Sequence, residues 1–148
     1  KIQEASFDVH ESGIDKPFHV ANTLAIIDQA DFKKSPLIAS EIFGPYTTVV
    51  MYDDIQVIEE YLTECKGQFT CSIFGNTDKA EEKKKIVNLA IERVGRIIIN
   101  DVPTGVVVSK AMQHGGPYPA SSDSRFTAVG SASIFRFVRD VTIQKNII

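Results

Sequence analysis

The sequence contains only two cysteines, Cys65 and Cys71, and this scarcity argues against a disulfide-stapled secreted protein. A reducing, cytoplasmic location is expected instead. Basic residues are not in excess either, because 16 lysines and arginines stand against 19 aspartates and glutamates. Nucleic-acid binders need a clustered basic surface to neutralise phosphates, so no nucleic-acid partner is expected. No apolar run approaches the roughly 20 residues that span a bilayer, so no membrane partner is expected.

Motifs for phosphate and metal binding are missing as well. There is no GxGxxG sequence and no Walker A loop. The histidines at positions 10, 19 and 114 have neither close spacing nor a cysteine partner, so no metal site is predicted. A length of 148 residues suits one domain. The chain does not begin with Met, and we expect it to be a piece of a longer protein.

What the sequence does contain is an alternation of strand-like and helix-like segments. Apolar runs rich in β-branched residues predict strands at residues 20–27, 47–52, 69–74 and 96–100. Between the last three, apolar residues recur at helical spacing over residues 55–65 and 86–94. Residues 30–35 are typical of a polar loop or a short helical turn. The order over residues 47–100 predicts an α/β fold, a βαβαβ unit with parallel strands and right-handed crossovers.

Local signals mark the helix ends. Asp53 and Asp78 each precede a glutamine or glutamate by three residues, which is the spacing of a capping box. Gly67 and Gly95 are expected to end the two helices. The acidic pairs at residues 53–54 and 59–60 are expected to cap and solvate helices rather than to act as acid–base groups.

The C-terminal third contains a long stretch without a packing period. Ligand sites in parallel sheets lie beyond the carboxyl ends of strands, where residues 101–105 follow the third strand. A loop rich in glycine, proline and serine comes next, at residues 114–124, and such loops commonly carry function. A short helix is expected around residues 131–138. A strand is expected over residues 140–144, and another element or another subunit would cover its edge.

Neither cysteine is expected to be a nucleophile. Cys71 follows a Gly-Gln pair closely, but it alternates inside an apolar strand, where cysteine behaves as a small hydrophobic residue. A reactive thiolate needs an electropositive and partly exposed setting. The same argument predicts that Cys65 is a core residue.

Residues 41–45 (EIFGP) place a carboxylate, an aromatic ring and a Gly-Pro turn just before a strand. The carboxylate of Glu41 can accept two hydrogen bonds from a ribose diol, and the ring of Phe43 can support a flat ring beside it. An ordinary turn, with a core phenylalanine and a solvated glutamate, accounts for the same residues, and chemistry alone favours it.

A longer pattern surrounds this pentapeptide. The EIFGP sequence resembles the cofactor-side motif of the aldehyde dehydrogenase superfamily, and residues 95–100 (GRIIIN) are similar to its glycine-to-asparagine strand motif. Residues 103–106 (PTGV), 112–121 (MQHGGPYPAS) and 122–125 (SDSR) resemble the branch that holds α-ketoglutaric semialdehyde (2,5-dioxovalerate) dehydrogenases and a bacterial fatty aldehyde dehydrogenase. The resemblance runs in family order from about residue 16 to residue 144.

This resemblance implies the C-terminal part of the catalytic domain of an enzyme that oxidises an aldehyde or semialdehyde to a carboxylic acid with NAD or NADP. In the family, a cysteine thiolate attacks the carbonyl, hydride passes to the nicotinamide, and a glutamate activates water. By the same resemblance, Glu41 holds the nicotinamide ribose hydroxyls and Phe43 packs beside that ribose and ring. The residues implied to line the aldehyde pocket are Pro103, Thr104, Gly105, Val106 and His114.

Two interpretations remain open for each of two further residues. His114 assists proton movement near the thiolate or makes a loop hydrogen bond. Arg125 binds a substrate carboxylate or forms a structural ion pair. Ser40 stands where many relatives have a second acidic residue, which leaves the implied role of Glu41 unchanged.

The family's nucleophilic cysteine, general-base glutamate and dinucleotide-binding domain are expected before the EIFGP segment, outside this chain. We therefore expect the isolated chain to be inactive. Two alternatives remain. One is an interaction module that forms a homo-oligomer or joins a partner through the C-terminal strand at residues 140–144. The other is a small standalone enzyme that uses Cys71 and His114.

Overall fold

The computed structural model describes residues 3–6, 22–34, 39–75, 79–105 and 107–146. It divides into two compact units, Lys1–Ile58 and Glu59–Ile148, each with its own sheet. The boundary between the units falls inside the helix α2 (Gln56–Glu64). Among the described elements, no helix combines the length and the apolar character that crossing a membrane requires.

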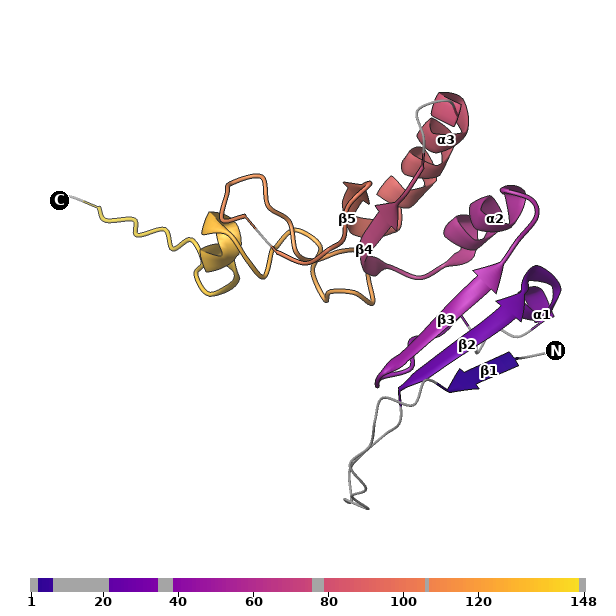
Figure 1. Cartoon of the computed structure of the whole chain (residues 1–148). Helices are drawn as coiled ribbons and strands as arrows, with labels where there is room; N and C mark the ends of the chain where they lie inside the picture. Colours follow the sequence, from indigo (N-terminus) through magenta and orange to yellow (C-terminus); the bar gives the residue numbers. More distant parts are fainter. Residues whose placement is uncertain (1–2, 7–21, 35–38, 76–78, 106, 147–148) are drawn as a thin grey trace, which may run out of the picture. The chain divides into compact units, whose positions relative to one another are not determined.

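The first unit is built on a three-stranded sheet in the order β1–β2–β3 (Figure 1). The central strand β2 (Thr23–Asp28) pairs with β1 (Gln3–Ser6) in antiparallel fashion and with β3 (Tyr46–Met51) in parallel. Along the chain, the helix α1 (Gln29–Lys34) follows β2 and precedes β3. Two parallel strands need such a crossover connection, which usually contains a helix. Ala25 and Ile27 are buried and lie two residues apart, so they share one face of β2.

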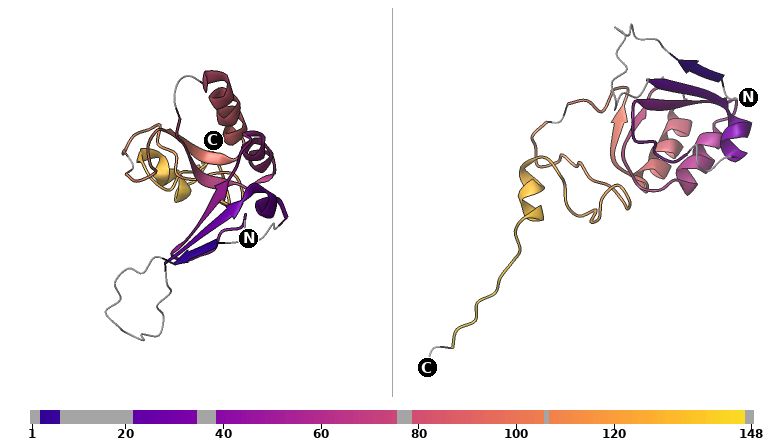
Figure 2. Two further views of the ribbon diagram at one scale, coloured as in Figure 1. Left: turned by 45° about the vertical axis from the view of Figure 1, so that its right-hand side comes forward. Right: turned by 90° about the horizontal axis from the view of Figure 1, so that it is seen from below.

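The second unit contains the parallel pair β4 (Gln68–Ile73) and β5 (Val94–Ile99), joined by α3 (Ala80–Ile91) (Figures 1 and 2). Ile86 and Ala90 of α3 are buried and lie four residues apart, on one face of the helix. This buried face is narrower than the apolar spacing over residues 86–94 predicts, because Ile91, which follows Ala90, is 57% exposed.

These elements confirm the predicted α/β class with parallel strands joined by helices. The parallel pairs are β2–β3 and β4–β5, one in each unit. The continuous βαβαβ unit predicted over residues 47–100 is therefore not one sheet in the described structure, because β3 pairs with β2 and β4 pairs with β5. The sequence pattern missed the unit β2–α1–β3, because a six-residue helix is too short to show a hydrophobic period. The segment at residues 30–35, left open between a loop and a helical turn, is this helix, and Asp28 Oδ1 accepts the Asp31 N–H at its start (2.8 Å).

The start of α2 differs from the predicted capping box. The Gln56 N–H donates to the carboxylate of Asp54, not Asp53, at 2.9 Å. Asp53 instead donates its backbone N–H to Oε1 of Gln29, which ties the end of β3 to α1. The second predicted capping residue, Asp78, lies outside the described residues. The residue at the N-cap position of α3 is Lys79, and its side chain makes no capping hydrogen bond in the described structure.

Both glycines that were predicted to stop helices have another structural role. α3 ends at Ile91, and Gly95 lies inside β5. α2 ends at Glu64, and Gly67 is buried three residues later. Both glycines permit a close backbone approach, described with the site below.

The C-terminal region contains the 3-10 helix η2 (Ser131–Arg136), which confirms the short helix expected there. The strand predicted over residues 140–144 is not formed, because residues 138–146 are an extended chain without helix or strand (Figure 2). A strand exists only when a neighbour accepts and donates its hydrogen bonds, and no described residue pairs with this segment. Its apolar residues are exposed, Ile143 by 89%.

Candidate functional site

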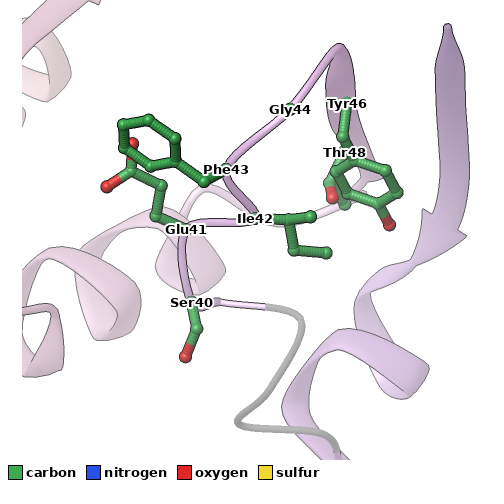
Figure 3. Close-up of a pocket in the computed structure, with 7 residues that line it drawn as sticks. All are labelled: Ser40, Glu41, Ile42, Phe43, Gly44, Tyr46 and Thr48. Carbon is green, nitrogen blue, oxygen red and sulfur yellow. The ribbon is translucent and has the colours of Figure 1, made fainter. Parts of the chain in front are cut away.

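The EIFGP loop leads into β3 and forms one side of a hollow of about 420 Å³ in the first unit (Figure 3). The hollow is lined by Ser40, Glu41, Ile42, Phe43, Gly44, Tyr46 and Thr48. Glu41 and Phe43 extend to the same side of the loop in Figure 3. The loop is anchored to the sheet, because Thr23 donates its backbone N–H to the carbonyl of Pro45 (2.8 Å).

The two residues that sequence analysis singled out in this loop are open to solvent. Phe43 is 97% exposed. The alternative interpretation of this loop, an ordinary turn with a core phenylalanine, is therefore wrong. Burying a phenylalanine side chain contributes roughly 1.5–3 kcal/mol, and this ring obtains none of it from the described fold. The Glu41 carboxylate is exposed and has no hydrogen-bond or ion-pair partner among the described residues. Both groups are therefore free to contact a ligand.

In the second unit, Asn100 joins the carboxyl ends of the parallel strands. It adopts a left-handed conformation (φ 54°), which asparagine tolerates better than most residues. Its N–H donates to the carbonyl of Ile73, and its side-chain Oδ1 accepts the N–H of Gly75, both at 2.9 Å. In the sequence, Asn100 stands out only as the last residue of the GRIIIN motif; the propensity of asparagine for left-handed turns was the available signal for its structural role.

The predicted pocket residues Pro103, Thr104 and Gly105 follow β5 and are exposed. Gly105 has φ +83°, a conformation that favours glycine, and Val106 lies outside the described residues. The Pro103 carbonyl accepts a hydrogen bond from Nη2 of Arg96 at 2.8 Å. The segment after β5 is thus tied back to the strand that precedes it.

His114 is held by its ring and by its backbone. Its imidazole stacks on Phe69, with ring centroids 5.3 Å apart and planes within 7°. Its N–H donates to Oγ1 of the buried Thr127 (2.9 Å), and its carbonyl accepts the N–H of Ala128 (2.9 Å). Nδ1 of the ring is buried and has no hydrogen-bond partner among the residues that the structure describes. The backbone of His114 therefore supplies the loop hydrogen bonds, while the Nδ1 atom remains unused.

The glycines of the 114–124 loop pack against the amino ends of β4 and β5. A Cβ on Gly95 would lie 1.9 Å from the carbonyl oxygen of Gly115, and one on Gly116 would lie 2.5 Å from that of Gln68. Gly67 donates its N–H to the carbonyl of Tyr118 in the same loop (3.2 Å). Residues 101–105 follow the carboxyl end of β5, but the 114–124 loop runs back to the opposite ends of the two strands. Such close approach is open to glycine because it has no Cβ.

Arg125 forms an ion pair with Asp123. The guanidinium donates to both carboxylate oxygens, with Nη2 2.6 Å from Oδ2, and lies 5.6 Å from the centroid of the Phe126 ring. The hydrogen bonds from Arg125 lower the pKa of Asp123 to about 2, and the same pairing raises the pKa of Arg125. The structure thus contains the structural ion pair, one of the two interpretations of Arg125.

The two cysteines have the properties of packing residues. Both are free and half-buried, and burial raises the pKa of each thiol. For Cys71, the nearby Cys65 raises the pKa further. At neutral pH both thiols are therefore protonated, which does not suit a nucleophile. Among the described residues, no cluster of three histidine, cysteine, aspartate or glutamate side chains is arranged to hold a metal ion.

Comparison with known proteins identifies relatives of the chain, although no family model matches it. The chain is 42% identical over 110 residues to an alpha-ketoglutaric semialdehyde dehydrogenase of Acinetobacter baylyi. It is 34% identical over 113 residues to alpha-ketoglutaric semialdehyde dehydrogenase 2 of Azospirillum brasilense. These matches cover 74% and 76% of this chain.

The same matches cover 21% and 22% of the two relatives, so the chain spans about a fifth of their length. Both relatives carry the name of the branch that the residues of the C-terminal third resemble. The chain is therefore a relative of the aldehyde dehydrogenases.

Proposed function

We propose that this chain is part of an NAD(P)-dependent dehydrogenase that oxidises a semialdehyde to a carboxylic acid, and that the chain alone is inactive. The names of the two relatives support the substrate class. The protonated, half-buried state of Cys71 supports a nucleophile from another part of the enzyme. A general base and a dinucleotide-binding domain are proposed to come from the same remaining part.

The observation that carries the proposal is the exposed pair formed by Glu41 and Phe43. A carboxylate without a partner can accept hydrogen bonds from both hydroxyls of a ribose, and a bare phenyl ring offers an apolar surface to a nicotinamide. The two side chains extend to one side of the loop, so one ligand can contact both. The residues present therefore fit a nicotinamide riboside.

In this proposal the cofactor supplies the acceptor for the hydride of the aldehyde. The chain's own residues bind and orient, with Glu41 fixing the ribose and Phe43 the ring beside it. Orientation matters because a misplacement of about 1 Å in a reacting group can cost roughly 100-fold in rate.

In the second unit, residues 103–106 and His114 are proposed to line the aldehyde pocket. The stacked ring of His114 has a buried Nδ1 atom without a partner in the described part of the chain, and this atom can hold or pass a proton when the site is complete. Val106 is included among the pocket residues because of the family resemblance.

A titration of the chain with nicotinamide mononucleotide, followed by NMR, tests the cofactor contact. This probe carries the ribose diol and the nicotinamide without the adenosine half. We expect amide shifts confined to residues 40–44 and a dissociation constant in the millimolar range, equivalent to about −4 kcal/mol. Glu41→Gln and Phe43→Leu should each abolish the shifts. Glu64→Gln and Phe137→Leu make the same changes at other exposed sites and should retain them.

Unaltered binding by Glu41→Gln and Phe43→Leu would contradict the cofactor contact. A second measurement tests inactivity: the chain is incubated with α-ketoglutaric semialdehyde and NAD or NADP, and reduced nicotinamide is followed by absorbance. No product is expected. Turnover that disappears in Cys71→Ala would instead identify a standalone enzyme. The coding sequence upstream of Lys1 offers an independent check, because the missing nucleophile and general base should be encoded there.

A second candidate function is an interaction module, favoured by the exposed C-terminal segment. Phe137, Val141 and Ile143 are 83%, 65% and 89% exposed, and the backbone from residue 138 to 146 pairs with no described strand. Pairing with the edge of a second copy would satisfy that backbone and yield a homo-oligomer. Analytical ultracentrifugation showing a monomer at high concentration would exclude this function.

A further inference from the structure

One arginine connects both segments of the proposed aldehyde pocket. Arg96 lies in β5, and its Nη2 donates to the carbonyl of Pro103 at 2.8 Å. Its Nη1 lies 3.6 Å from Sδ of Met112, two residues before His114. A single guanidinium therefore contacts the chain that leaves β5 and the chain that returns toward His114.

Both of these contacts are made with neutral acceptors. No ion pair of Arg96 exists within the described part of the chain, and Nε is buried without a partner. The side chain thus leaves one donor unsatisfied while its two terminal nitrogens reach two separate segments. A guanidinium in this position joins the segments to each other rather than neutralising a charge.

The neighbouring residue completes the anchoring. Successive residues of a strand point to opposite faces, so Gly95 and Arg96 contact the returning segment from the two faces of β5. Gly95 packs against the backbone of Gly115, and Arg96 contacts the sulfur of Met112. Of these two residues, only Arg96 also reaches Pro103.

We propose that Arg96 is a positioning residue that sets the spacing between the Pro103–Gly105 segment and His114, and thereby the fit of the aldehyde. The inference rests on the proposed function for the identity of the pocket. Lysine cannot replace arginine here, because an ammonium is a point donor and a guanidinium is a rigid fork that serves two acceptors at once.

NMR of the chain tests the linkage without requiring activity. In the unaltered chain we expect a scalar coupling across the hydrogen bond from the Arg96 guanidinium to the Pro103 carbonyl. In Arg96→Lys, the carbonyl shift of Pro103 and the methyl shift of Met112 should change together. Arg139→Lys, a change at an exposed arginine, should move neither. Met112→Leu removes only the sulfur acceptor and should leave the Pro103 coupling in place.

Kinetics of the intact dehydrogenase tests the function of the linkage. Arg96→Lys should raise KM for the semialdehyde about tenfold and leave KM for the cofactor unchanged, because only the aldehyde side is displaced. A purely structural arginine would lower the amount of active enzyme and leave both KM values unchanged. That result, or an absent coupling in the unaltered chain, overturns the inference. An intact protein without dehydrogenase activity would overturn the proposed function instead, and the NMR measurement would still decide the linkage.

Discussion

Replacement of Gly95 by alanine should destabilise the second unit more than its single methyl group suggests. A Cβ at this position would lie 1.9 Å from the carbonyl oxygen and 2.6 Å from the carbonyl carbon of Gly115. Ordinary contact begins at 3.4 Å, and the atoms in the way are backbone, which cannot rotate aside as a side chain can. Either β5 or the loop must therefore move.

The expected cost follows from the size of this overlap. Overpacking a well-packed site costs about 1–3 kcal/mol, and a clash with rigid backbone belongs at the upper end, at about 3 kcal/mol. Such a loss corresponds to roughly a 100-fold change in the folding equilibrium. Gly75→Ala is the matched control in the same unit, because a Cβ there meets no atom of the described residues within 4 Å.

Urea unfolding, followed through the amide signals of β4 and β5, measures both variants. We expect Gly75→Ala to stay close to the unaltered chain and Gly95→Ala to unfold at clearly lower urea. If the two unfolding free energies agree within about 0.5 kcal/mol, the range of neutral surface substitutions, the packing of the 114–124 loop on β5 is wrong.

Three further outcomes are expected. Arg93 donates from Nε to the carbonyl of Leu62 (3.1 Å) and from Nη2 to that of Thr63, near the end of α2. Arg93→Met removes this cation from the helix C-terminus and should lower the free energy of unfolding, measured in urea, by about 1 kcal/mol. The pKa of Asp123 is lowered to about 2, so its contribution to stability is full above the unfolded value of about 3.9 and is lost as pH falls toward 2. Carboxyl NMR of Arg125→Gln should show a midpoint near the unfolded value, and an unchanged low midpoint would contradict the ion pair. Cys71 should react slowly with a thiol reagent at neutral pH and quickly in urea, because burial raises its pKa.

The parts of the fold that sequence predicted are those with a local signal. β3, β4 and β5 are apolar runs rich in β-branched residues, and α3 buries Ile86 and Ala90, which lie about one helical turn apart. In α2 the buried residues are Val57 and Leu62, which lie five positions apart and do not follow the predicted helical spacing. β1 has no such signal, and it is a strand because it pairs with β2 in antiparallel fashion. The strand predicted over residues 140–144 failed for the converse reason, since its pattern is present but no described strand pairs with it.

The candidate site divides in the same way. Glu41 and Phe43 were predicted from a five-residue motif, and the structure adds that both are exposed beside one hollow. Arg96 was quoted only as part of a strand motif. Its importance depends on Pro103 and Met112, which follow it by seven and 16 positions. No local pattern in the sequence indicates these two partners.

The sequence by itself determined the α/β class, the presence of Glu41 and Phe43 in one short loop before a strand, and the relationship to the aldehyde dehydrogenases. All three features depend on which residue types occur close together in the sequence. Strands and helices have fixed side-chain periods, so a short sequence pattern is enough to indicate them. Only the tertiary structure decided that the 114–124 loop packs on the amino ends of β4 and β5, and that Arg96 joins two distant segments. Those contacts require close packing between residues far apart in the chain, which depends on how complete elements come together.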